Sequence, residues 1–330
     1  MPKTGVQKLA FLSIVLLVVL IFAGAVVRVT GSGLGCPDWP TCWGKIIPPT
    51  NVAEVDLEVL RDPKRMARFR RSAERWGRDP DEVTPENLLN EFNAVETWIE
   101  YGNRLLALPV LLANFLLMVA CLRSRTYPGL GVASFALVII SALTGIVVVA
   151  SGLRAGVVTI HMALAFLQLF LLTYLYWAGG RKPHARQSIP GPGRPAVMVL
   201  LACVMVEWAM GSQIREVTDD LMREYGVESR PDWIGELSDA LVYLVHRSFS
   251  WSILISALWL GHRAGWRGLV PRTILALVGS LMVMGLVLST SGIHAVVQVL
   301  HVGVAGVLVS MAYYWWLAAD WKGKDGQGVG

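Results

Sequence analysis

Charged residues are scarce in this chain: Asp, Glu, Lys and Arg make up 16% of its 330 residues, while hydrophobic residues make up 54%. A soluble protein of this length can bury a core with far less apolar sequence. The low charge therefore excludes an ordinary soluble domain and indicates a protein of the lipid bilayer. Outside the loops, no basic patch is interleaved with aromatic residues, so the sequence gives no sign of a nucleic acid partner.

Cysteine is scarce as well, with four residues in the chain. Cys121 and Cys203 fall in apolar segments, where a free thiol behaves as a small packing residue. Cys36 and Cys42 lie in a stretch interrupted by Gly and Pro, just after the first apolar segment. Their spacing fits a short disulfide loop on an oxidising face of the membrane, and it also fits two free thiols or a pair of metal ligands.

Long hydrophobic runs, in contrast, recur along the whole chain. Each is long enough to cross a hydrocarbon layer of about 30 Å as a helix. The first run exceeds the apolar core of a signal peptide and no clean cleavage site follows it, so we expect it to be retained. The sequence predicts an all-α integral membrane protein with eight transmembrane helices, at 9–29, 105–122, 130–150, 156–178, 196–212, 242–261, 269–290 and 295–319.

The distribution of Lys and Arg predicts the orientation of these helices. Short loops and termini on one side carry basic residues, and such loops face the cytoplasm. We therefore expect a multi-pass protein of the cell (plasma) membrane with both termini in the cytoplasm. The opposite side would carry two tight turns and two long loops, 31–97 and 213–241. The basic residues are Lys3, Lys8, Arg123, Arg125, Arg181, Lys182, Arg186, Arg194, Arg263, Arg267, Arg272, Lys322 and Lys324.

One stretch of the chain occurs twice. The segment 145–165 recurs at 285–305 after a shift of 140 residues and without a gap. Each copy is an apolar run, a Ser-Gly break and a second apolar run with one histidine near its start. This pattern predicts two membrane helices joined by a tight turn. The identical pairs are Gly145/Gly285, Val147/Val287, Ser151/Ser291, Gly152/Gly292, Ala155/Ala295, Val157/Val297, His161/His301 and Ala165/Ala305.

The duplication extends to the other helices. Aligning Arg104 with Arg247, a shift of 143 residues, places Asn103 on His246 and Glu100 on Tyr243. The predicted fifth helix ends in Gly-Ser at 211–212, as the first ends in Gly-Ser at 31–32. We therefore predict two tandem, pseudo-symmetric four-helix bundles that form a parallel repeat: 1–184 with the long outer loop 31–97, and 185–330.

His246 and His301 are the candidate metal ligands of the second unit. Two neutral imidazoles on facing helices of a four-helix unit can hold a heme iron between them. Zinc or copper would want a third or fourth ligand close by, and His294 could be offered as one. At the same depth lie several arginines that could pair with heme propionates or anchor lipid headgroups: Arg28, Arg104, Arg215 and Arg247.

The first unit departs from this symmetry. It has His161, but Asn103 stands where a second histidine would be, and Glu100 lies one helical turn before Asn103 on the same helix face. A carboxylate beside an iron with an open coordination position indicates chemistry, whereas a closed pair of histidines indicates electron transfer. The alternative is that Glu100 forms an ordinary ion pair with Arg104 four residues later.

Several motifs together resemble the heme A synthase family: VRVTGSGLGCPDWPTCWG, E-Y-x-x-R from Glu100 to Arg104, GSQIRE after the fifth apolar run, and the repeated histidines. The resemblance covers nearly all eight predicted helices. It implies an oxidoreductase that converts the C8 methyl group of heme O to a formyl group by successive hydroxylation. It also implies a supply of heme A to terminal oxidases.

The resemblance assigns roles to individual residues. It implies that His246 and His301 hold a heme B cofactor and that Glu100 is catalytic. The substrate heme would lie at His161, beside Asn103 and Arg104, although Asn103 replaces the histidine of the family pattern. Cys36 and Cys42 would match the family's cysteine pair. The partners implied are heme O, the lipid bilayer, heme O synthase and terminal oxidase assembly factors, with a homo-oligomer as a further expectation.

Three other classes of protein compete with this interpretation. A b-type cytochrome that exchanges electrons with quinone would hold heme but would have no need of Glu100. A duplicated transporter usually has Gly/Pro breaks and charges near the membrane midplane, whereas the polar residues here gather at the outer ends of the helices. The prenyltransferase that farnesylates heme needs Asp-rich motifs, and Asp219-Asp220 alone does not supply one.

Overall fold

The computed structural model describes residues 4–36, 38–55, 57–75, 79–179 and 193–319. Eight of the described helices are long and apolar enough to cross a membrane, which confirms the predicted all-α membrane fold. They are α1 (Gly5–Val29), α5 (Ala94–Ser124), α6 (Pro128–Ala150), α7 (Ala155–Ala178), α8 (Arg194–Tyr225), α10 (Leu241–Arg263), α11 (Leu269–Thr290) and α12 (Ala295–Ala318).

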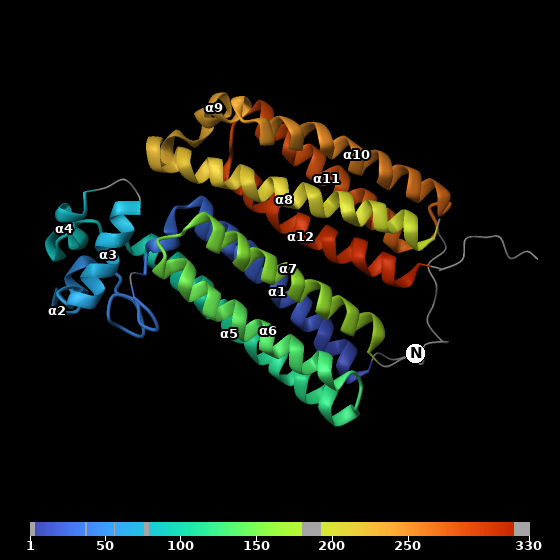
Figure 1. Cartoon of the computed structure of the whole chain (residues 1–330), viewed down its shortest axis with the longest axis horizontal. Coiled ribbons are helices and arrows are strands. Elements are labelled where there is room, and N and C mark those ends of the chain that lie inside the picture. The colour runs from blue at the N-terminus through green and yellow to red at the C-terminus, as the bar shows by residue number, and fades with distance from the viewer. Residues whose placement is uncertain (1–3, 37, 56, 76–78, 180–192, 320–330) are drawn as a thin grey trace, which may run out of the picture.

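Short helices gather at one end of the long ones. Between α1 and α5 lie η1 (Ser32–Leu34), η2 (Val52–Glu54), α2 (Leu57–Leu60), α3 (Pro63–Arg75), η3 (Pro80–Glu82) and α4 (Pro85–Asn90). Between α8 and α10 lie η5 (Val227–Trp233) and α9 (Ile234–Asp239). Figure 1 shows these segments at the end of the molecule opposite to the start of α1 and the end of α12. We call it the insert end.

Which end faces the cytoplasm stays a prediction. Six of the basic residues on which that prediction depends lie outside the described residues: Lys3, Arg181, Lys182, Arg186, Lys322 and Lys324.

Local sequence explains where α1 and α5 begin. The Thr4 hydroxyl accepts the backbone N–H of Gln7, and the Gln7 side chain accepts the N–H of Thr4, which forms a capping box. Asn93 caps α5 by accepting the N–H groups of Val95 and Glu96. The capped helix therefore starts well before its apolar run and includes two of the candidate site residues, Glu100 and Asn103.

The fifth transmembrane helix does not end where the sequence pattern predicts. Instead of ending near 212, α8 continues through Gly211 and Ser212 to Tyr225. The added turns have an apolar face: Leu221 is buried against Trp233, and Ile214 packs on the same cluster. This local core replaces lipid as the environment of the helix, which explains why the extension remains helical while its sequence becomes more polar.

The repeated Ser-Gly break ends a membrane helix in both copies. Ser151 ends α6 and Ser291 ends α11, and in both cases the next residue has a left-handed backbone, with φ 63° at Gly152 and 98° at Gly292. Glycine adopts this conformation without the steric cost that a Cβ brings. The structure therefore confirms the predicted pairs of membrane helices joined by a tight turn.

The eight helices pack as two groups of four. α1, α5, α6 and α7 contact one another, α8, α10, α11 and α12 do the same, and α12 joins the groups by packing on α1 and α7 (Figure 1). The hydroxyls of Thr173 and Ser310 lie 2.7 Å apart across this junction. Gly303 of α12 also lies directly against the ring of Phe22 of α1. The division into units 1–184 and 185–330 and their duplication stay predictions, and the boundary between them lies outside the described residues.

Candidate functional site

A large cavity extends across both groups of helices. Its volume is about 1500 Å³, and residues from all eight long helices line it, most of them apolar. A site for one small molecule typically has roughly 300–1,000 Å³. The cavity is therefore large enough for more than one ligand, and its wall includes every candidate ligand position of both groups: Asn103, His161, His246 and His301.

His246 of α10 and His301 of α12 face each other across this cavity. Their ring centroids are 6.4 Å apart and their planes are inclined by 62°. Two imidazoles on opposite sides of one metal ion would have centroids roughly 6 Å apart, because a metal–nitrogen bond is about 2 Å long. The pair thus has the spacing that a single shared metal ion requires.

The surroundings of this histidine pair do not favour zinc or copper. Within the described ranges, no group of three or more His, Cys, Asp and Glu side chains lies close enough to hold a metal ion. His294, the one candidate for a third ligand, is exposed at the start of α12. A metal that completes its coordination with a ligand of its own, as heme iron does, suits two imidazoles alone.

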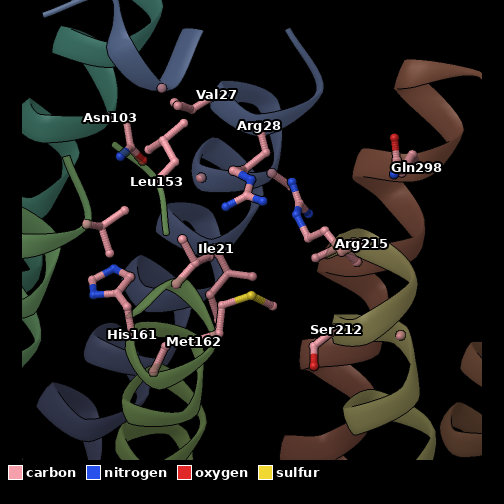
Figure 2. Close-up of a pocket in the computed structure, with 18 of the residues that line it drawn as sticks. Ile21, Val27, Arg28, Asn103, Leu153, His161, Met162, Ser212, Arg215 and Gln298 are labelled. Carbon is pink, nitrogen blue, oxygen red and sulfur yellow. The ribbon is translucent and has the colours of Figure 1, made fainter. Parts of the chain in front are cut away.

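The other group of helices contributes His161 from α7 and Asn103 from α5 to the same cavity (Figure 2). Oδ1 of Asn103 is buried and has no hydrogen-bond partner among the described residues. A buried acceptor without a partner costs free energy comparable to a lost hydrogen bond. This oxygen is therefore available to a ligand or a water molecule at the position where the second group has an imidazole.

A glycine on a neighbouring helix faces each of these four side chains. A Cβ atom at each glycine would lie within 4 Å of the facing side chain. Any larger side chain would take the space that the imidazole or amide occupies. The distances from such a Cβ are 3.3 Å for Gly145 to Cε1 of His161, 3.9 Å for Gly285 to Cε1 of His301, 3.8 Å for Gly211 to Cε1 of His246, and 4.0 Å for Gly24 to Oδ1 of Asn103.

This arrangement corrects one sequence-based correspondence. Gly211 lies inside α8 and faces His246, whereas Gly31 lies beyond the end of α1, before η1, with a φ of 73°, so the two are not equivalent. The counterpart of Gly211 is Gly24. Both are followed four residues later by an arginine, Arg28 in α1 and Arg215 in α8. The sequence repeat alone could not identify this pair because the surrounding residues differ.

Glu100 is engaged in the ion pair that the sequence offered as an alternative to a catalytic role. Its side chain is buried, and Oε1 accepts from Nη2 of Arg104 at 2.5 Å. Oε2 accepts the backbone N–H of Cys36 at 2.8 Å. Glu100 also lines the cavity, so its carboxylate is located between the ligand space and the loop that begins at Cys36.

Arg104 fastens this loop to α5. Its guanidinium donates to the carbonyl oxygens of Cys36 at 3.0 Å, Asp38 at 2.8 Å and Thr41 at 3.2 Å. Cys36 and Cys42 form a disulfide, which confirms the first of the three states considered for this pair. The disulfide closes the loop, and the Glu100–Arg104 pair fixes it over the insert end of the cavity.

Arginines from both groups meet at the insert end. Figure 2 shows the side chains of Arg28 and Arg215 pointing toward each other between α1 and α8. Arg28 pairs with Asp219, and Arg215 is 8% exposed with its Nε buried and unpartnered among the described residues. These two and Arg104 point into the protein, so they do not anchor lipid headgroups. Arg247, in contrast, is exposed.

A third buried arginine connects η5 with both groups. Arg230 donates to the carbonyl oxygen of Val29 and to Oε1 of Gln298, the latter at 2.8 Å. Burial lowers the pKa of Arg230, because the charged form loses hydration. Of these three arginines, Arg28 and Arg215 line the cavity. They place cationic groups at this end, which can bind an anionic ligand.

Glu207 belongs to this site although it is not among the candidate residues that the sequence motifs indicated. It lies on α8 and lines the cavity, with Oε1 3.3 Å from Nδ1 of His246. A carboxylate near Nδ1 orients an imidazole so that Nε2 faces a metal. The signal was available, because a single acidic residue inside the apolar run 196–212 is costly in a membrane and usually functional.

The fold and the site define a multi-pass membrane protein with a pair of imidazoles spaced for one metal centre and a second, asymmetric His–Asn position in the same cavity. The chain matches the COX15-CtaA family, described as "Cytochrome oxidase assembly protein", over residues 7–313, and it belongs to that family. The family match spans nearly all of the described helices.

Curated relatives are similar over most of their length. A protein of Sphingopyxis alaskensis named "Heme A synthase" is 27% identical over 339 residues, which cover 94% of this chain and 91% of the relative. One of Rhizorhabdus wittichii with the same name is 27% identical and covers 92% and 91%. One of Methylobacterium sp. strain 4-46, again with that name, is 27% identical and covers 78% and 74%.

The hydrogen bonds from Arg104 and Glu100 to the disulfide loop lead to a testable prediction. Arg104→Lys keeps the charge but cannot reach three carbonyl groups and a carboxylate at once, because a lysine lacks the planar fork of a guanidinium. We expect the Cys36–Cys42 disulfide to be reduced several-fold faster by dithiothreitol, as followed by the mass added by a maleimide. Arg61→Lys, at an exposed i,i+3 ion pair in the insert, is the control and should leave the rate unchanged. An unchanged rate in Arg104→Lys would show that these hydrogen bonds do not protect the loop.

Proposed function

We propose that this chain is a heme A synthase, an oxidoreductase that converts the C8 methyl group of heme O to a formyl group. The observation that carries the proposal is the histidine pair with centroids 6.4 Å apart in a cavity shared with a second, incomplete ligand pair. Membership of the COX15-CtaA family and the relatives named "Heme A synthase" support the same activity.

His246 and His301 fit a resident heme B. When bound, that group would supply one-electron transfer. The two imidazoles would hold its iron, Gly211 and Gly285 leave room for the rings, and Glu207 near Nδ1 would fix the orientation of His246. The mostly apolar wall of the cavity excludes water from a porphyrin, and the arginines at the insert end would bind its propionates.

The substrate heme O would lie in the other group of helices, at His161. Its second axial position would face the Asn103 amide, which is a poor iron ligand and would instead hydrogen-bond a water molecule. Asn103 and Arg104 would thus orient the substrate, and Glu100 would take up a proton released as the methyl group is oxidised. The Glu100 carboxylate suits this role because it borders the cavity while Arg104 holds it in place.

A b-type cytochrome exchanging electrons with quinone is less well supported. It would account for His246 and His301 but not for the lone histidine of the first group or for a buried Glu100. We further propose that the chain lies in the cell (plasma) membrane with both termini in the cytoplasm. Heme O synthase, terminal oxidase assembly factors and a second copy of the chain are the proposed partners.

The ligand assignment predicts the spectrum of the purified protein. His301→Ala should lose most of the low-spin b-type absorbance, since one imidazole alone leaves the iron with an open axial position. His294→Ala is the matched control: it removes an exposed imidazole seven residues earlier and should keep the spectrum. A wild-type spectrum in His301→Ala would remove this residue from the ligand set.

The catalytic role predicts a separation of heme binding from turnover. Glu100→Gln keeps the shape of the side chain and an acceptor for the Cys36 N–H, but it cannot take a proton. We expect normal heme content, with product reduced at least about 100-fold, the usual scale for a lost acid–base group. Heme extraction and chromatography after co-expression with a heme O supply should show heme O or its hydroxylated intermediate. Normal heme A output would leave Glu100 with only its ion pair to Arg104 and its hydrogen bond to Cys36.

The third expectation concerns the axial position beside Asn103. With substrate bound, the ferric wild-type protein should show one bis-histidine low-spin signal from the second group and a distinct signal from the single-histidine substrate heme. In Asn103→His, electron paramagnetic resonance should show that signal converted to a second bis-histidine species, with turnover reduced. A bis-histidine signal from both hemes in the wild type would contradict the single-ligand arrangement.

A further inference from the structure

Three polar side chains hydrogen-bond to one another deep inside the first group of helices. Asn114 of α5, Ser134 of α6 and Gln168 of α7 are 0%, 0% and 1% exposed. Oδ1 of Asn114 accepts from Oγ of Ser134 at 2.9 Å and from Nε2 of Gln168 at 2.8 Å, and the latter also reaches Ser134 at 2.8 Å. Such a buried polar cluster in a membrane segment is costly and usually serves a function.

One hydrogen-bonding atom of this cluster is unused. Oε1 of Gln168 is buried and has no partner among the described residues, and Gln168 lines the cavity. Gln168 follows His161 by seven residues on α7, so it lies on the same helix face about 10.5 Å further from the insert end. Its Cα–Cβ bond tilts toward the start of the helix, and therefore toward His161. The cluster thus holds an acceptor on the deep side of the substrate position.

The second group has no such acceptor at the equivalent positions. The 140-residue shift that superimposes His161 on His301 places Leu308 at Gln168 and Ile274 at Ser134, and the 143-residue shift places Ala257 at Asn114. These three are equally buried, at 2%, 1% and 2% exposure, and Leu308 also lines the cavity. The polar cluster therefore distinguishes the proposed substrate position from the proposed cofactor position.

Heme O and heme B differ chemically at one edge of the ring. Heme O carries a hydroxyl group on the carbon that joins its isoprenoid tail to the ring, where heme B carries a vinyl group. That edge is opposite to the propionates. If the propionates bind the arginines at the insert end, the tail-bearing edge points toward the depth of Gln168.

We infer that Oε1 of Gln168 accepts a hydrogen bond from the tail hydroxyl of the substrate, while Asn114 and Ser134 hold the amide in that orientation. This inference rests on the proposed function and adds the group by which the chain selects a hydroxyalkyl heme for its first site. Leu308 at the equivalent position accepts a vinyl-bearing heme instead, because it offers neither a donor nor an acceptor.

Two iron porphyrins that differ in a hydroxyl group test its contribution to binding. Iron hematoporphyrin carries 1-hydroxyethyl groups where iron mesoporphyrin carries ethyl groups, and neither has a tail. Dissociation constants come from Soret titrations of the purified full chain with its resident heme in place. In the wild type, hematoporphyrin should bind more tightly than mesoporphyrin. We expect the ratio of the mesoporphyrin dissociation constant to the hematoporphyrin dissociation constant to fall by about tenfold in Gln168→Leu, the scale of one lost hydrogen bond. Gln168→Asn, which withdraws the amide by one methylene and keeps it polar, should also lower the ratio.

Two controls separate the possible failures. Ser134→Ala removes a member of the cluster but leaves the Gln168 amide bonded to Asn114, and it should keep most of the wild-type ratio. His161→Ala should abolish binding of both probes, which assigns the titration to the first site. Binding that survives His161→Ala would overturn the proposed function and this inference together. A wild-type ratio in both Gln168 variants, with binding abolished by His161→Ala, would overturn this inference alone.

Discussion

Room for an imidazole between tightly packed apolar helices is the constraint on which the site depends. A large polar side chain fits between two such helices most easily where the facing helix presents a small residue. Gly145 and Gly285 meet this requirement opposite His161 and His301, and Gly24 and Gly211 meet it opposite Asn103 and His246. In both groups of helices, these glycines leave room for side chains that line the cavity.

The surrounding lipid adds a second constraint, because it offers no hydrogen bonds to polar groups. Each polar side chain inside must therefore have a partner in the protein or in a ligand. Most of them do: Glu100 and Arg104 bond the disulfide loop, and Arg230 bonds Val29 and Gln298. The buried polar atoms without a hydrogen-bond partner among the described residues indicate where a ligand can bind. They include Oδ1 of Asn103, Nε of Arg215 and Oε1 of Gln168, and all three residues line the cavity.

The two groups of helices differ at three positions of the cavity wall. Asn103, Glu100 and Gln168 in the first group correspond to His246, Tyr243 and Leu308 in the second. The first group thus presents an amide, a carboxylate and a second amide to the cavity where the second group presents an imidazole, a phenol and an alkyl chain. These few differences are the basis for proposing that one position holds a reacting substrate and the other a resident cofactor.

The sequence by itself determined the class of protein, the eight membrane helices and the repeated helix pair with its histidine, because hydropathy, length and glycine turns act locally. It also identified Cys36 and Cys42 as a candidate pair and Glu100–Arg104 as a candidate ion pair. Only the tertiary structure showed that α8 continues past 212, because the apolar face of the extension has meaning only against Trp233 and Leu237. The same holds for Glu207 beside His246 and for Gly24 opposite Asn103. These contacts join residues far apart in the chain, and no periodicity or spacing in the sequence encodes which helix faces which.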